Sequence, residues 1–265
     1  MNISSSRLVA DRITLSYGER VVVEDLTLAI PDQKITVVVG PNACGKSTFL
    51  RALARLLAPA AGTVLLDGKA ISERPSREVA QILGVLPQTP IAPEGITVRD
   101  LVSRGRHPHQ SWWRQWGDAD ADAVAQALEA TGTTEIADRD VDEISGGQRQ
   151  RAWIAMAVAQ GTDLLLLDEP TTYLDLAHQL DVLELVATLN REHGRTIALV
   201  LHDLNLASRY AHHIVAMRAG RIVAQGRPDE VITTDLLREV FNIEATIVTD
   251  PMSGAPVVLP HRTVA

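Results

Sequence analysis

The sequence GPNACGKS, residues 40 to 47, is the stretch from which the fold can be worked out. It follows the continuous β-branched run from Ile35 to Val39 and opens a segment, Lys46 to Leu57, that has helical periodicity and stops before Pro59. A glycine-rich loop between a buried strand and a helix fits the pattern G-x-x-x-x-G-K-[ST], whose backbone amides and helix N-terminus bind phosphate. We therefore expect a phosphate-binding loop in an α/β protein.

Each residue of this loop is a candidate nucleotide contact. Lys46 would supply a positive charge to the β and γ phosphates, and the Ser47 hydroxyl would bind Mg²⁺. Ala43 stands where many such loops have glycine, so we expect a negative φ there. Cys44 lies beside a helix N-terminus, which predicts a lowered thiol pKa and access to alkylating reagents; a small buried thiol is the alternative. The candidate contacts are Gly40, Pro41, Asn42, Ala43, Cys44, Gly45, Lys46, Ser47 and Thr48.

Two adjacent carboxylates follow a second apolar run. The four leucines from Leu164 to Leu167 predict a buried strand, and Asp168 and Glu169 come directly after it. Open α/β sheets bind their ligands at the carboxyl ends of their strands. We expect Asp168 to hold Mg²⁺, directly or through water, and Glu169 to be the general base that polarises the attacking water.

A third motif, Ser145-Gly146-Gly147-Gln148, precedes a segment with helical periodicity. On its own it has a structural explanation, because S-x-x-Q before a helix is a capping box. Together with the other two motifs, in this order and at this spacing, it resembles the signature motif of the ATP-binding cassette (ABC) ATPases, with Ile144 where that family usually has leucine. The resemblance implies that Ser145, Gly147 and the helix N-terminus meet the γ-phosphate of an ATP bound by a second subunit.

The resemblance assigns roles to four more residues. It implies that Tyr17 stacks on adenine, although an aromatic on a strand face is the alternative. It also implies that Gln88 touches Mg²⁺ and faces the permease, that His202 is the switch histidine at the γ-phosphate, and that Asp175 lies in a loop crossing the dimer interface. A lone histidine is more often structural, so His202 depends on its position.

Three less specific sequence segments indicate a subfamily. The segments GRHPH (105–109), EPTTYLD (169–175) and HDLN (202–205) look like those of ATPases in bacterial importers for ferric siderophores, haem and vitamin B12. This similarity implies a homodimer that sandwiches two MgATP, at the cytoplasmic face of the membrane. It further implies a separate permease and, indirectly, an extracytoplasmic substrate-binding protein.

Several alternatives remain open at this point. They are a manganese or zinc importer, an exporter, a soluble ABC ATPase of DNA repair or translation, and a regulator that binds nucleotide without hydrolysing it. The cargo itself is not encoded in these motifs.

Composition and charge limit the kinds of protein that this chain could be. The chain has 265 residues, a formal net charge of −8 and one cysteine. The negative net charge gives no sign of nucleic-acid binding, which depends on Lys and Arg side chains that neutralise phosphates. A single cysteine excludes an intramolecular disulfide. Apolar windows are far shorter than the roughly twenty residues of a membrane helix, and residues 1 to 7 lack the pattern of a signal peptide. We expect a cytosolic chain.

The expected fold class is α/β, with a P-loop NTPase (RecA-like) core sheet, an antiparallel N-terminal β-subdomain and an inserted helical subdomain. We expect one ABC ATPase domain over 1–265, with its core at 1–96 and 161–226, helices at 97–160 and an extension at 227–265. Strand hairpins are predicted around Tyr17 to Arg20, Asp67-Gly68, Ala219-Gly220 and Asp250 to Gly254. The extension carries no catalytic pattern, which favours a structural role.

Some residues stay without a role. The tryptophans Trp112, Trp113 and Trp116 lie close to Arg114 and would be either exposed for a partner or folded into the helical insertion. The histidines other than His202 lack the spacing of a zinc site, so we expect surface positions for them. The acidic residues Asp138, Asp140, Asp142 and Glu143 are expected to form a solvated loop.

Overall fold

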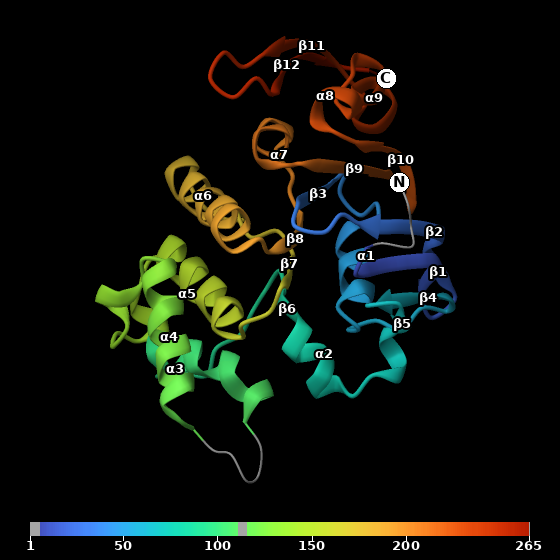
Figure 1. Cartoon of the computed structure of the whole chain (residues 1–265). Coiled ribbons are helices and arrows are strands. Elements are labelled where there is room, and N and C mark those ends of the chain that lie inside the picture. The colour runs from blue at the N-terminus through green and yellow to red at the C-terminus, as the bar shows by residue number, and fades with distance from the viewer. Residues whose placement is uncertain (1–5, 111–115, 265) are drawn as a thin grey trace. The chain divides into compact units, whose positions relative to one another are not determined.

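A computed structural model describes residues 6–110 and 116–264, and the chain divides into two compact units. The first, which we call the terminal unit, comprises Met1–Arg74 and Thr196–Ala265. The second, the central unit, comprises Pro75–Arg195. The terminal unit therefore begins the chain, is interrupted by the central unit, and resumes to the end (Figure 1).

The terminal unit contains an antiparallel sheet in the order β2-β1-β4-β5. Its strands are β1 (Leu8–Tyr17), β2 (Arg20–Ile30), β4 (Ala61–Leu66) and β5 (Lys69–Ala70). Asp67 and Gly68, between β4 and β5, both have positive φ, at 48° and 73°. That is the conformation of a type I′ hairpin turn, for which Asp-Gly is a preferred pair. The antiparallel N-terminal sheet predicted from sequence is confirmed.

The terminal unit also holds the strands β10-β9-β3-β8, in that order. They are β3 (Ile35–Val39), β8 (Thr196–Val200), β9 (His213–Arg218) and β10 (Arg221–Gly226). β3 pairs in parallel with both β8 and β9, whereas β10 is antiparallel to β9. All five residues of β3 are buried, as are those of β8, which agrees with sequences that are apolar except for Thr36 and Thr196. The helices α1 (Lys46–Leu53) and α7 (Leu204–Tyr210) follow β3 and β8 along the chain.

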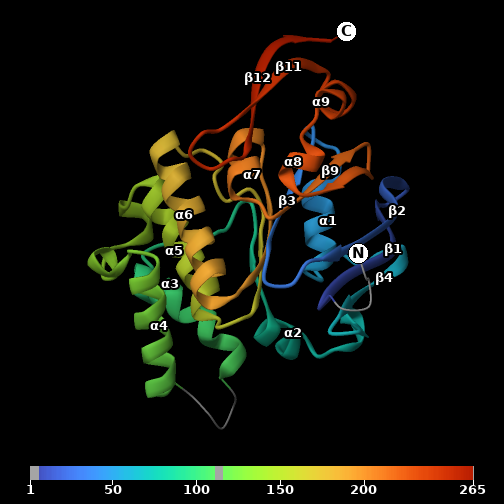
Figure 2. The same cartoon turned by 45° about the horizontal axis from the view of Figure 1, so that its top comes forward.

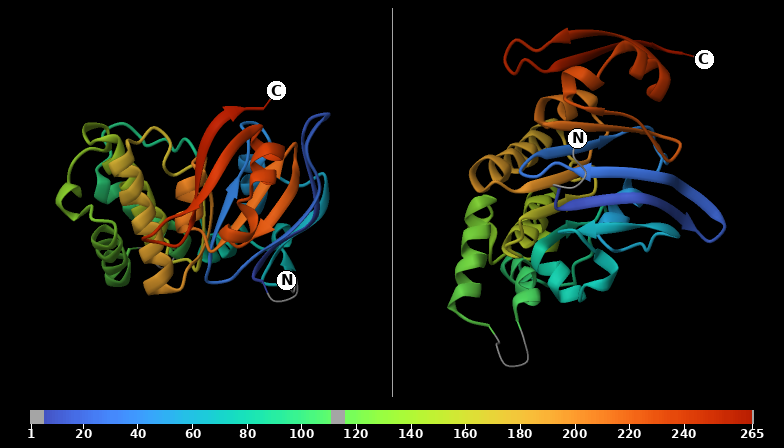
Figure 3. Two further views of the ribbon diagram at one scale, coloured as in Figure 1. Left: turned by 90° about the horizontal axis from the view of Figure 1, so that it is seen from above. Right: turned by 45° about the vertical axis from the view of Figure 1, so that its right-hand side comes forward.

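The C-terminal part of this unit contains two helices and the hairpin predicted around Asp250 to Gly254. It comprises α8 (Pro228–Val231), α9 (Thr234–Phe241), β11 (Ile243–Thr249) and β12 (Pro256–Thr263). Figure 3 shows β11 and β12 as a long two-stranded ribbon in the last part of the chain. Asn205 on α7 bonds twice to the backbone of Val258 on β12, donating to its carbonyl at 3.3 Å and accepting from its N–H at 2.7 Å. The hairpin is therefore fastened to α7.

The central unit is mainly helical (Figure 2). Its elements are α2 (Ser76–Ile82), β6 (Leu83–Leu86), α3 (Val98–Ser103), α4 (Asp118–Ala130), α5 (Gly146–Ala159), β7 (Leu164–Leu167) and α6 (Leu176–His193). Short 3-10 turns lie at Ile71–Glu73 in the terminal unit and at Arg104–His109, Thr134–Ile136 and Val141–Glu143 in the central one. β6 and β7 pair in parallel. The helices predicted between 97 and 160 are confirmed, whereas α2 and β6 were not predicted.

A buried ion pair ties the helices of the central unit together. Arg106 Nε donates to Asp120 Oδ1 at 2.9 Å, and the two side chains are only 10% and 2% exposed. Arg106 Nη1 also donates to the carbonyl of Ala159 at 2.7 Å, which links the segment before α4 to the end of α5. Removing one partner of such a pair would leave a buried charge without compensation, typically at a cost of about 3 to 5 kcal/mol.

The structure changes one expectation about helix length and leaves the expected subdomain bounds untested. The first helix ends at Leu53 rather than Leu57, because Arg55 takes a left-handed φ of 60°. No helix among the residues that the structure describes is long and apolar enough to cross a membrane. The division into a core, a helical subdomain at 97–160 and an extension at 227–265 stays a prediction.

Candidate functional site

The glycine-rich loop lies in the terminal unit, between the buried strand β3 and helix α1. A Cβ on Gly40 would lie 2.2 Å from the Met217 carbonyl oxygen, and one on Gly45 would lie 3.0 Å from Val23 Cγ2. Both glycines also have positive φ, at 152° and 108°. The neighbouring strands therefore press on the loop closely enough that only glycine fits at these two positions.

Lys46 begins α1 and is 4% exposed. Its Nζ donates to the carbonyl oxygens of Gly40 at 2.9 Å and Pro41 at 2.8 Å, so the ammonium group lies over the loop. The ammonium has three N–H donors, and these two bonds use two of them. The N-cap of α1 is Gly45, whose lack of a side chain leaves the first backbone amides of the helix without a side-chain cap. The loop thus has the donors of an anion-binding site.

The prediction for Ala43 was wrong. Its φ is 61°, in the left-handed region, not negative. This conformation costs a residue with a Cβ roughly 1 to 2 kcal/mol. Left-handed residues are part of the backbone nests whose successive N–H groups bind anions. Ala43 therefore adopts the conformation that glycine would have taken in the same loop.

The prediction for Cys44 was also wrong. Cys44 is 5% exposed, and burial raises the pKa of its thiol, with a smaller opposing effect from the positive charge of Lys46. Desolvation of the thiolate thus outweighs the helix N-terminus and the lysine together. Its Sγ lies 2.9 Å from the place where a Cβ on Gly40 would be, so the thiol fills the base of the loop. The structure favours the alternative of a small buried side chain.

The two carboxylates lie in the central unit. Asp168 directly follows β7, is 6% exposed, and its N–H donates to the carbonyl of Leu86 at the end of β6 at 2.9 Å. Because β6 and β7 are parallel, the loop after β6 reaches the same edge, and Gln88 Nε2 donates to Glu169 Oε2 at 2.6 Å. Thr172 Oγ1 donates to the same oxygen at 3.0 Å. Within this unit the structure brings Gln88, Asp168 and Glu169 together.

Thr172 was not identified from the sequence. It lies three residues after Glu169, and the Thr172 N–H donates to the Glu169 carbonyl at 3.2 Å, so the two residues share one turn. Glu169 has a positive φ of 52°. The sequence shows a hydroxyl residue three positions after the candidate base. Only the observed turn shows that this hydroxyl reaches the Glu169 carboxylate.

The third motif forms the capping box that its sequence predicts. Ser145 Oγ accepts from the Gln148 N–H at 3.2 Å, and Gln148 Oε1 accepts from the Ser145 N–H at 3.1 Å. Helix α5 begins at Gly146, and Ser145 and Gly146 are exposed. The capping box thus accounts for Ser145 and Gln148 structurally, while Ser145 lies at the surface; a second function for Ser145 stays a prediction.

Asp175 caps the following helix, α6. Its Oδ1 accepts from the His178 N–H at 2.9 Å and is 2.7 Å from His178 Nδ1. The backbone bond, followed by the bond to the ring, lowers the pKa of the Asp175 carboxyl, which is thus ionised at neutral pH. Its apolar neighbours Tyr173 and Leu176 are 99% and 65% exposed. Two large apolar side chains in solvent beside the cap mark a surface suited to a protein partner.

Tyr17 and His202 lie in the terminal unit. Tyr17 ends β1 and is 47% exposed. His202 lies between β8 and α7 and is exposed. Directly after it, Asp203 caps α7, and its Oδ1 accepts from the N–H groups of Asn205 and Leu206 at 2.8 and 2.9 Å. The roles of Tyr17 and His202 at a nucleotide stay predictions.

The remaining candidates divide as follows. His213 is 8% exposed, and burial lowers its pKa, so the expected surface position was wrong for this residue. No group of three or more His, Cys, Asp or Glu side chains that could hold a metal ion occurs in the described ranges 6–110 and 116–264.

Trp112, Trp113 and Arg114 lie outside the described residues, and Trp116 is 48% exposed. In the acidic loop, Asp138 and Asp142 pair with Arg99 and Arg149 on the surface.

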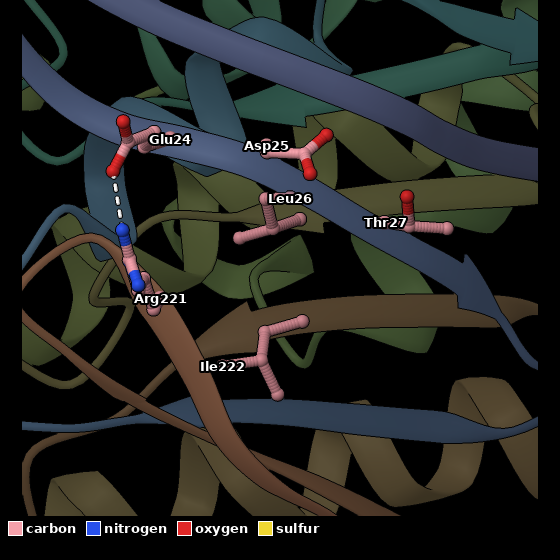
Figure 4. A pocket seen from close by; sticks show the side chains of 6 residues that line it. All are labelled: Glu24, Asp25, Leu26, Thr27, Arg221 and Ile222. Atoms are coloured by element: carbon pink, nitrogen blue, oxygen red, sulfur yellow. Dashed lines mark hydrogen bonds and ion pairs between the residues drawn. The ribbon is translucent and has the colours of Figure 1, made fainter.

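One further hollow, of about 550 Å³, lies in the terminal unit between β2 and β10. Figure 4 shows Glu24 and Arg221 facing each other across it, with an ion pair of 2.5 Å, and Leu26 and Ile222 lining it. Both charged side chains are mostly exposed, so this pair contributes little stability. None of the residues singled out in the sequence lines this hollow.

Comparison with known proteins agrees with these features. The model of the ABC transporter family matches residues 23–172. The petrobactin import ATP-binding protein FpuD of Bacillus anthracis is 54% identical over 254 residues, covering 96% of this chain and 93% of FpuD. The ferric enterobactin transport ATP-binding protein FepC of Escherichia coli (strain K12) is 52% identical over 260 residues, covering 98% and 96%. A solved inward-facing metal-chelate type ABC transporter matches with a TM-score of 0.83 at 27% identity, covering 97% of both chains.

Proposed function

Because this chain belongs to the ABC transporter family, we propose that it is the ATP-binding and hydrolysing subunit of an importer that energises uptake of an iron-siderophore cargo through a separate permease. The observation that carries the proposal is identity above 50% over nearly the whole chain with import subunits named for petrobactin and ferric enterobactin. A similarity that extends through the C-terminal extension covers more than the nucleotide motifs that all such ATPases share.

ATP is the nucleotide, and the loop from Gly40 to Ser47 is proposed to hold its phosphates. Support comes from the left-handed Ala43, from Gly45 as an N-cap without a side chain at the start of α1, and from the Lys46 ammonium over the loop. Thr48 follows on the first turn of the helix. Tyr17, half-exposed at the end of β1, is the proposed platform for adenine.

Mg²⁺ fits the residues present. Ser47, Gln88 and Asp168 offer a hydroxyl, an amide and a carboxylate, the oxygen ligands that Mg²⁺ prefers. Mg²⁺ is usually held by one or two carboxylates plus phosphates rather than by an all-protein cage, which agrees with there being no larger cluster of metal ligands among the described residues. When bound, the ion would neutralise charge on the β and γ phosphates.

Glu169 is the proposed general base. Gln88 and Thr172 both donate to its Oε2, which restrains the orientation of the carboxylate; its role would be to take a proton from the attacking water. His202 is proposed to contact the γ-phosphate. Neither role requires the side chain to be unpaired in the resting protein, because catalytic hydrogen bonds rearrange when substrate binds.

The active form is proposed to be a homodimer in which Ser145, Gly146, Gly147 and Gln148 of one subunit face the ATP of the other. The exposed Tyr173 and Leu176 beside Asp175 support a partner at this surface. ATP would favour the closed dimer, and hydrolysis would return it to the open one. We place the protein at the cytoplasmic face of the membrane, attached through the permease, with a substrate-binding protein acting from the other side.

Uptake measurements test the proposal. Loss of this chain from its host should abolish accumulation of iron supplied as a ferric siderophore, and the wild-type chain should restore it. The Lys46→Ala variant should fail to restore uptake although it accumulates as folded protein. Unchanged siderophore uptake together with lost transport of manganese, zinc or an exported compound would instead favour another ABC transporter.

A further inference from the structure

Gly147, the second residue of α5, has no room for a side chain. A Cβ built on it would lie 2.2 Å from Cδ2 of His178, 2.7 Å from Cγ and 3.0 Å from Nε2. Gly147 is buried, and its φ is not positive, so the backbone conformation does not require glycine. Glycine inside a helix is also less favourable than alanine. Within one subunit, the imidazole ring that lies against its bare backbone therefore excludes a side chain at this position.

The ring of His178 is held in one orientation. Asp175 Oδ1 lies 2.7 Å from Nδ1 and also accepts from the His178 backbone N–H at 2.9 Å. An ionised carboxylate only accepts hydrogen bonds, so Nδ1 carries the proton and donates. One oxygen of Asp175 thus both caps α6 and fixes the ring. The ring in turn presents its Nε2 and Cδ2 edge to Gly147.

A second contact joins the same two segments. Leu174 Cδ2 lies 3.9 Å from the position of a Cβ on Gly146, at van der Waals distance. Leu174 and His178, on either side of Asp175 in the chain, therefore lie next to the two glycines of the Ser145 to Gln148 motif, of which Gly147 is buried and Gly146 is exposed. All of these residues belong to the central unit, so the contacts lie within one compact part of the chain.

We propose that His178 is a positioning residue that sets the N-terminus of α5 against the loop carrying Asp175. The inference rests on the proposed sandwich dimer, in which both segments must meet the partner subunit together. The ring, whose side chain is 38% exposed, lies against Gly147 and sets the spacing of the two segments, and with it the geometry in which Ser145 and Asp175 reach the partner. Without the ring, each segment still has its own cap, but their separation is no longer fixed.

The test compares variants in a Glu169→Gln background, where slow turnover allows the ATP-bound dimer to accumulate. His178→Ala removes the ring and its bond, and His178→Asn keeps a donor that can reach Asp175. His193→Ala, at the exposed end of the same helix, is the matched control. MgATP is titrated while dimer formation is followed by analytical ultracentrifugation. Binding of ATP to the monomer and thermal unfolding are measured in parallel.

We expect His178→Ala to need about tenfold more ATP for half-maximal dimer formation, because small displacements of positioned groups are costly. His193→Ala should match the parent, and His178→Asn should recover part of the loss. ATP binding by the monomer and the folded fraction should stay within about twofold of the parent, since the phosphate loop belongs to the other unit. The proposal would be overturned if His178→Ala formed dimers as readily as His193→Ala. It would also be overturned if the loss of dimer in His178→Ala only matched a loss of folded protein.

A pair of substitutions that adds a methyl group at Gly147 and removes the ring at His178 provides a second test. Gly147→Ala should lower the unfolding temperature because the methyl group meets the ring, and His178→Ala in the same chain should restore it. Equal destabilisation with and without the ring would overturn the contact on which the inference depends. If the parent with native His178 does not dimerise with ATP at all, the proposed function fails as well, which distinguishes the two results.

Discussion

The carboxylate of Glu169 is oriented by two donors on one oxygen, Gln88 Nε2 and Thr172 Oγ1. Replacing it with Gln keeps the size and an oxygen that can accept, so the turn should survive while the base is lost. We predict that Glu169→Gln lowers the rate of ATP hydrolysis by about a hundredfold to ten-thousandfold. Binding of MgATP should persist and promote dimers. Steady-state hydrolysis and equilibrium binding measure the two effects, and near-normal hydrolysis would contradict the assignment.

Burial of Cys44 makes stability depend on pH. Because burial raises the pKa of the folded thiol, the unfolded chain ionises first as pH rises past the ordinary value of 9.0. The contribution to stability is complete below that value and is lost as pH rises toward the folded pKa. The free energy of unfolding should then fall with a slope of up to about 1.4 kcal/mol per pH unit.

Cys44→Ala isolates this effect, since it removes one titrating group and leaves the others. Denaturant unfolding of both proteins should give parallel curves at neutral pH and a steeper fall for the wild type in alkali. Identical pH slopes would mean that the thiol is not buried in solution. Alkylation should likewise be slow in the folded protein with or without ATP and rapid in denaturant.

The side chains that sequence predicted well are those whose role depends on neighbours in the chain. Gln148 caps Ser145 across one turn, as the S-x-x-Q pattern predicts, whereas the contact of Lys46 with phosphate stays a prediction. Cys44 was predicted wrongly because its burial arises only in the folded chain, where the raised pKa of its thiol follows from that burial. The positive φ of Ala43 likewise belongs to the folded loop, whose ends at Gly40 and Gly45 lie close to Met217 and Val23, residues distant in sequence.

Helix α7 and the hairpin β11–β12 are joined through one side chain. The amide of Asn205 acts like a backbone group toward Val258, donating to its carbonyl and accepting from its N–H. We predict that Asn205→Ala destabilises the protein by about 1 to 3 kcal/mol, because both backbone groups lose their partner. Asn205→Asp keeps the acceptor and loses the donor, so its cost should be intermediate. Hydrogen exchange of Val258 reports the change directly, and unaltered protection in Asn205→Ala would refute it.

Elements were predictable where their sequence signals were strong and local. Helix α5 begins directly after the capping box that the sequence predicts, and Gly194 in a left-handed conformation ends α6. Strand β6 was missed because Leu83–Leu86 contains a glycine and has no alternation. Gly84 is there because a Cβ would lie 2.8 Å from Leu165 Cδ2 on the paired strand β7. That contact comes from a segment distant in sequence.

The whole chain carries the proposed parts of a nucleotide site in two units. The phosphate loop, Tyr17 and His202 belong to the terminal unit, while Gln88, the two carboxylates and the capping-box motif belong to the central one. The proposed dimer would pair the loop of one subunit with Ser145 of the other. Activity would then depend on which residues are intact across two chains rather than within one.

Mixed dimers distinguish a site built from two subunits from a site built within one. A Ser145→Arg subunit has a working phosphate loop, and a Lys46→Ala subunit has a working Ser145, so their mixture forms one intact composite site and one with both defects. In a Glu169→Gln background we predict that neither variant alone forms an ATP-dependent dimer. Mixing them should restore a dimer that retains one ATP, because Lys46 and Ser145 then come from different chains. Native mass spectrometry of the mixture counts subunits and nucleotides, and differently tagged subunits identify the heterodimer. If Ser145 served its own subunit's nucleotide, both chains would be defective and mixing would restore nothing, a result that would reject the sandwich.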